Sequence, residues 1–135
     1  MDLTQLLLTG SLSGLISVLA HSALWSAIAM ATRRQPITNA EPPMSEAVLH
    51  MLAGVALAFL FWMSWGLAAL TDGRWWMRGA SFGALCWTAL AFPPIASMVV
   101  ARTLDARSGI LIASRWATTA VGVGLACAWT WHRAA

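Results

Sequence analysis

The stretch AVLHMLAGVALAFLFWMSWGLAAL, residues 47–70, decides the fold of this chain. It holds 24 consecutive residues without a formal charge, and only His50 and Ser64 interrupt its apolar character. A helix rises about 1.5 Å per residue, so this stretch can cross the roughly 30 Å hydrocarbon core of a bilayer with some tilt. A soluble helix of this length needs a polar face, and none is present. We interpret the stretch as a membrane span.

The composition of the whole chain agrees with that interpretation. Of 135 residues, 59% are hydrophobic and only 10% are charged, whereas soluble domains carry about 25% charged residues. The net charge of +3 does not indicate nucleic-acid binding, because the eight arginines are spread over the connecting regions and form no basic stripe. We therefore predict an integral membrane protein with a single transmembrane domain covering residues 1–135.

Three further uncharged or nearly uncharged runs complete the predicted topology. The sequence predicts spans at approximately 4–31, 46–70, 79–101 and 109–131. Short connections place consecutive helices antiparallel, so the predicted fold class is an all-α, integral membrane four-helix up-down-up-down bundle. The first run has one alternative interpretation, a cleaved signal peptide, since Ala29-Met30-Ala31 is similar to a cleavage site. A retained span is favoured because no basic residue precedes the run and its apolar region is about twice the usual length.

Arginine counts in the connections indicate an orientation. The first and third connections carry Arg33, Arg34, Arg102 and Arg107, and the opposite side carries Arg74, Arg78 and Arg133. Cytoplasmic loops are enriched in arginine, so this bias places both termini in the periplasm of a bacterial-type inner (plasma) membrane.

Small residues recur at helical spacing on several of the predicted spans. These helix-packing candidates are Gly10, Gly14, Ser17, Gly54, Gly83, Thr118 and Gly122. Small side chains let the backbones of two membrane helices approach closely. Besides the lipid bilayer, the expected partners are therefore helices of other membrane-protein subunits or of a second copy of this chain, and nucleic acid is not among them.

Pro93-Pro94 is the strongest irregularity in the predicted spans. Two consecutive prolines remove two backbone donors and leave the carbonyls of Ala89 and Leu90 without helical partners. The residue before a proline is also disfavoured in the α region. The third span is therefore expected to kink or break, either as a purely structural feature or as part of a polar site lined by the freed carbonyls.

Three ionisable residues are expected in the same leaflet. Counting about 1.5 Å per residue from the Arg33 side, His50 lies roughly 5 Å deep, Arg115 roughly 10 Å and His21 roughly 15 Å. With Pro93 and Pro94 they are candidates for a polar vestibule, because ionisable groups in a membrane usually face the bundle interior or water. The simpler alternatives are an Arg115 that reaches the headgroups beside Asp105 or Glu46, and a His21 that is hydrogen-bonded across a helix pair.

No cofactor, metal site or catalytic residue is predicted. Haem held between two histidines needs rings at similar depth, and His21 and His50 differ by about 10 Å in this count. Cys86 and Cys127 form no CxxC pair, and they are either small buried residues or a disulfide between the third and fourth spans. No acidic residue lies in the interior of a predicted span, since Glu46 stands at the very start of the second, so an enzyme is not favoured.

These observations favour a non-catalytic accessory or subunit protein that binds partner helices. The alternative is a small carrier or channel, with a polar vestibule at His21 and Arg115 and at the Pro93-Pro94 helix break. The motifs identify no family.

Overall fold

The computed structural model describes residues 2–31, 44–64 and 74–134, and these residues are almost entirely helical. The elements are α1 (Leu3–Ala31), α2 (Met44–Met63), α4 (Trp75–Cys86), the π-helix η1 (Trp87–Ala91), α5 (Phe92–Val100) and α6 (Ala106–Ala134). Four helical stretches are long and apolar enough to cross a membrane, the third of which comprises α4, η1 and α5. The predicted all-α class and the four spans are confirmed. The described residues leave out part of the predicted topology. They do not include the first connection, residues 32–43, or the end of the predicted second span and the turn after it, residues 65–73.

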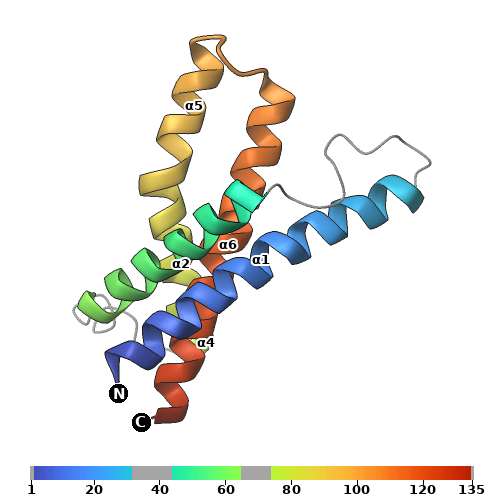
Figure 1. The fold of residues 1–135 in the computed structure, drawn as a ribbon. Coiled ribbons are helices and arrows are strands. Elements are labelled where there is room, and N and C mark those ends of the chain that lie inside the picture. Colours follow the sequence, from blue (N-terminus) through green and yellow to red (C-terminus); the bar gives the residue numbers. More distant parts are fainter. Residues whose placement is uncertain (1, 32–43, 65–73, 135) are drawn as a thin grey trace.

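The helices form two packed pairs, and α6 belongs to one pair and also contacts the other. α1 packs along α2, α4 packs along α6, and α6 also contacts α1 and, less extensively, α2. Figure 1 shows the α1–α2 pair crossing the pair formed by α6 and the third span at a steep angle, with both termini at the same end. Because α6 lies between α4 and the α1–α2 pair, the polar residues of α6 meet side chains of α1 and α2.

Glycines bring the backbones of α1 and α2 into direct contact. A Cβ atom on Gly54 would collide with the carbonyl oxygen of Gly10, and one on Gly14 would collide with the carbonyl of His50. The same device recurs between α4 and α6, where a Cβ on Gly83 would lie 2.6 Å from the Cα of Val121. These close approaches fix how each helix is rotated toward its neighbour.

The remaining packing candidates lie on α1 and α6. Ser17 is buried, and its Oγ lies against Gly122 where α1 crosses α6. Thr118 is exposed, and its hydroxyl donates to the Ser114 carbonyl of its own helix over 2.9 Å. The structure thus places six of the seven candidates at helix–helix contacts and turns Thr118 outward.

The apolar core lies toward the end of the molecule that holds the termini. Its members are Leu6, Leu57, Ala58, Phe82, Ala120, Val123 and Cys127. The Phe61 ring meets the Phe82 ring edge-on, with 5.1 Å between ring centroids. Cys127 is fully buried in this core and Cys86 is packed against it, and both are free thiols. The disulfide between Cys86 and Cys127, one of the two alternatives that the sequence allowed, is therefore not formed.

The third span does not break at Pro93-Pro94. The expectation was a kink or a break, and the break is wrong because the chain stays helical from Trp75 to Val100. A π-helical turn directly precedes the two prolines. The Phe92 N–H donates to the Trp87 carbonyl five residues earlier, which widens the turn. Both prolines then fall in the first turn of α5, directly after this widened turn.

A tight turn joins α5 to α6. Arg102 has φ 60°, and its N–H donates to the Val99 carbonyl while the Thr103 N–H donates to the Met98 carbonyl. These two bonds form a Schellman motif, with arginine at the left-handed position that usually holds glycine. Asp105 follows, and its carboxylate accepts a hydrogen bond of 3.3 Å from the Ser108 N–H at the start of α6.

The Asp105 cap is expected to fail in acid. The pKa of the Asp105 carboxyl lies below its ordinary value because the hydroxyl and the backbone N–H of Ser108 donate to the carboxylate. A group whose pKa is lowered by folding stabilises the fold at higher pH, and this contribution disappears as the pH falls through the lowered value. The protection factor of the Ser108 amide, which corrects for the slower intrinsic exchange in acid, should therefore fall as the pH is reduced from about 5 to about 3. Asp105→Asn should abolish this pH dependence, and an unchanged profile in that variant would contradict the assignment.

Candidate functional site

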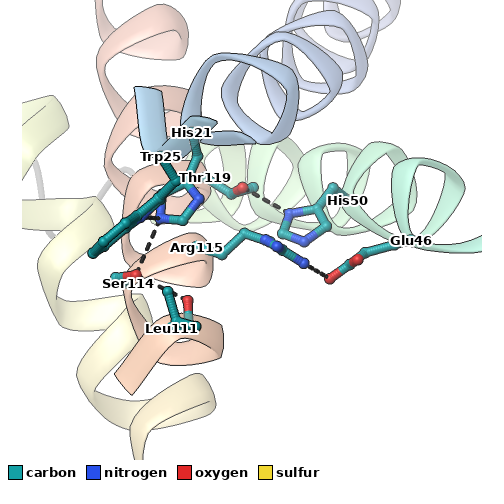
Figure 2. Close-up of polar contacts among 8 residues, drawn as sticks. All are labelled: His21, Trp25, Glu46, His50, Leu111, Ser114, Arg115 and Thr119. Carbon is teal, nitrogen blue, oxygen red and sulfur yellow. Dashed lines mark hydrogen bonds and ion pairs between the residues drawn. The ribbon is translucent and has the colours of Figure 1, made fainter. Parts of the chain in front are cut away.

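A buried group of polar side chains lies where α1, α2 and α6 meet, and we refer to it as the polar cluster (Figure 2). Its members are His21, Trp25, Glu46, His50, Ser114, Arg115 and Thr119. Figure 2 shows the Arg115 side chain extending from α6 toward His50 and Glu46 of α2, with His21 of α1 beside the base of that side chain.

His21 is held in one tautomer by its neighbours. Its Nε2 accepts a hydrogen bond of 2.9 Å from the Trp25 indole N–H and lies 3.0 Å from the Ser114 hydroxyl. An indole nitrogen only donates, so Nε2 must carry the lone pair and the ring proton sits on Nδ1. That Nδ1–H is buried, and none of the described residues accepts its hydrogen bond.

His50 is fully buried between α2 and α6. Its Nδ1 lies 2.7 Å from the Thr119 hydroxyl, and its ring stacks on the Trp116 indole with centroids 4.0 Å apart and planes inclined by 15°. Its Nε2 is buried and has no partner among the described residues. The ring is therefore fixed in orientation with one nitrogen left unused.

Arg115 and Glu46 form an ion pair at the edge of the polar cluster. The Arg115 Nη1 donates to the Glu46 Oε1, and the side chains are 10% and 25% exposed. The Arg115 Nε–H is buried without a partner in the described structure. Of the two carboxylates that the sequence offered to Arg115, the fold selects Glu46, because Asp105 is exposed and caps its own helix.

The structure brings together three of the five vestibule candidates. His21, His50 and Arg115 converge in the polar cluster, although counting residues along each helix placed them at different depths. They can meet because α1 and α2 cross α6 steeply. Pro93 and Pro94 are exposed on α5 and are not part of the polar cluster.

Several members of the polar cluster were not expected from the sequence. Trp25 lies four residues after His21, a spacing that places two side chains on one helix face and was a usable signal. The cross-helix contacts of Ser114 and Thr119 have no such signal, because they depend on how α6 is rotated toward α1 and α2.

The polar cluster has a surplus of hydrogen-bond donors. The Arg115 Nε–H and the His21 Nδ1–H are both buried donors without acceptors, which suits an acceptor-only oxyanion or a transient proton acceptor. His21 Nδ1 and His50 Nε2 are both buried without a partner among the described residues, so each of these two imidazoles has one unused nitrogen. Among the described residues no group of three or more His, Cys, Asp and Glu side chains could hold a metal ion.

The polar cluster brings several kinds of functional group together. Its geometry combines a buried cation, a carboxylate and two histidines within apolar helices. No protein-family model, curated protein or solved structure matches the chain.

Proposed function

We propose that this four-span membrane protein is a small carrier or channel whose polar cluster binds the solute that it moves. The observation that carries the proposal is the convergence of His21, His50 and Arg115 inside apolar helices. Ionisable groups within membrane spans are costly, and they mark solute or proton pathways by default. The Arg115–Glu46 pair lowers that cost but leaves the guanidinium only partly used.

The unpaired buried nitrogens favour a binding role over a purely structural one. A buried polar group without a partner costs about 1–3 kcal/mol, and His21, His50 and Arg115 each contribute one such atom. A structural cluster of the same size lowers its free energy by pairing these atoms internally. A solute that pairs with them during transit recovers this cost.

A flux assay with paired variants tests the proposal. Liposomes containing the purified protein are exposed to gradients of pyruvate (a monocarboxylate), succinate or phosphate, and uptake is compared with that of empty liposomes. We expect protein-dependent uptake of at least one solute, reduced about tenfold or more by Arg115→Ala and by His21→Ala, which corresponds to about 1.4 kcal/mol or more.

Matched controls use the same residue types outside the polar cluster. Arg107→Ala and His132→Ala remove an exposed arginine and an exposed histidine and should leave uptake unchanged. Uptake no greater than in empty liposomes, or equal losses in the control and cluster variants, would refute a carrier role.

A second candidate function, an accessory protein that binds partner helices, is favoured by the third span. In the most apolar 18-residue segment of the third span, only 6% of the residues are buried within the fold, against 33% in the corresponding segment of the fourth span. None of the residues of α5 is buried. Partner helices are one way to cover this face. Cross-linking in native membranes followed by mass spectrometry should then recover one stoichiometric partner on α5, and recovery of lipid adducts alone would exclude this role.

A further inference from the structure

We propose that Arg115 exchanges carboxylates: Glu46 occupies its guanidinium in the empty protein, and a small solute bearing one carboxylate takes the place of Glu46. This inference rests on the proposed function and names the class of solute for the same site. It assigns Glu46 the role of an internal competitor that keeps the buried cation neutralised between binding events.

Glu46 uses only part of the guanidinium. Its Oε1 accepts from Arg115 Nη1, while the Arg115 Nε–H is buried with no acceptor in the described residues. A guanidinium presents five N–H donors in a planar fork, and a carboxylate can engage two of them in parallel. The present pair is therefore weaker than the bidentate pair that an unconstrained carboxylate can form with the same side chain.

Glu46 is also the member of the pair that can leave. It lies in the first turn of α2 and is 25% exposed, whereas the Arg115 side chain is 10% exposed. The free N–H groups and the dipole at a helix start stabilise a negative charge there, so Glu46 can be released toward water without losing all its favourable interactions. Arg115 has no comparable route to water, and it needs an anion whenever Glu46 is displaced.

The charge balance favours a monocarboxylate. Replacing one carboxylate by another leaves the polar cluster with the same net charge, whereas a dianion adds a buried negative charge. The neighbouring His21 offers a donor, since its Nδ1–H is buried without an acceptor.

Binding of acetate to the full chain tests the exchange. The protein is labelled with [15N]arginine in an uncharged maltoside detergent, which supplies no competing anion, and the Nε–H resonance of Arg115 is identified by its loss in Arg115→Lys. We expect acetate to shift this resonance saturably, while the uncharged isostere acetamide and chloride leave it in place.

Removal of the internal competitor should strengthen binding. If Glu46 occupies Arg115 for about 90% of the time, Glu46→Gln should bind acetate about tenfold more tightly, because apparent affinity scales with the fraction of protein that is free to bind. Asp105→Asn makes the same charge change at an exposed site outside the polar cluster, and it should leave the affinity unchanged.

Several outcomes would overturn the exchange. An Arg115 resonance that does not respond to acetate, an equal response to acetamide, or the same affinity in Glu46→Gln as in the unmodified protein would each do so. Should Arg115→Lys not fold, the difference between Glu46→Gln and Asp105→Asn in acetate-dependent melting temperature carries the test alone.

The two proposals fail in different ways. Flux that depends on Arg115 together with an acetate affinity that is insensitive to Glu46→Gln would sink the exchange and leave the carrier. Tight acetate binding by Glu46→Gln without any protein-dependent flux would sink the carrier and leave a carboxylate-binding site.

Discussion

Gly54→Ala is expected to lower the free energy of unfolding by about 2–3 kcal/mol, whereas Gly122→Ala is expected to change it by less than about 0.5 kcal/mol. Both variants add one methyl group to a helix glycine, and they differ in what the methyl group meets. At Gly54 it meets the backbone carbonyl of Gly10, so α1 and α2 must move apart. At Gly122 it meets the Ser17 side chain, whose hydroxyl can rotate away and whose Cβ atom lies at an ordinary contact distance of 3.5 Å.

Equilibrium unfolding in mixed micelles, followed by far-ultraviolet circular dichroism, measures the difference between these two variants. Gly122→Ala serves as the control for any general effect of an extra methyl group on a membrane helix. Equal losses of stability in the two variants would show that the close α1–α2 contact at Gly54 does not hold the helices together.

A double-mutant cycle on Arg115 and Glu46 should show strong coupling between them. Glu46→Gln leaves the guanidinium buried without a counter-charge and is expected to cost about 3 kcal/mol. Arg115→Gln should cost less, about 1–2 kcal/mol, because the more exposed Glu46 can turn toward water. The double variant removes both charges, so its loss should fall short of the sum by about 1–3 kcal/mol.

The exposed residues Asp105 and Arg107 provide the control cycle. Asp105→Asn and Arg107→Gln make matching charge changes outside the polar cluster, and their coupling should be within about 0.5 kcal/mol of zero because solvent screens the charges. A coupling between Arg115 and Glu46 no larger than in this control would contradict a buried pair. Added acetate should also recover part of the stability lost in Glu46→Gln, as expected for a ligand that binds only the folded state.

The membrane spans were predictable because hydropathy is a local property. Uncharged runs around His50, in residues 3–32 and in residues 79–101 are long enough to cross a bilayer whatever their neighbours do. The glycine positions were predictable for a similar reason, because a helical spacing of small residues marks a contact face without saying which helix it meets.

Local sequence was not sufficient at Pro93-Pro94. The missing donors of two prolines were correctly identified, but the chain accommodates them by a π-helical turn rather than by a break. The Trp87 indole N–H donates to the Ala113 carbonyl of α6 over 2.9 Å, which helps hold this turn against the neighbouring helix. A tertiary contact of this kind cannot be inferred from proline content.

The sequence by itself determined that four helices are long and apolar enough to cross a membrane and that His21, His50 and Arg115 lie within three of them. Only the tertiary structure decided that Arg115 pairs with Glu46, that Trp25 sets the tautomer of His21, and that these side chains share one cluster. The physical reason is that partner choice depends on the rotation and crossing angle of each helix. Backbone contacts between glycines distant in sequence set these angles, as at Gly10 and Gly54.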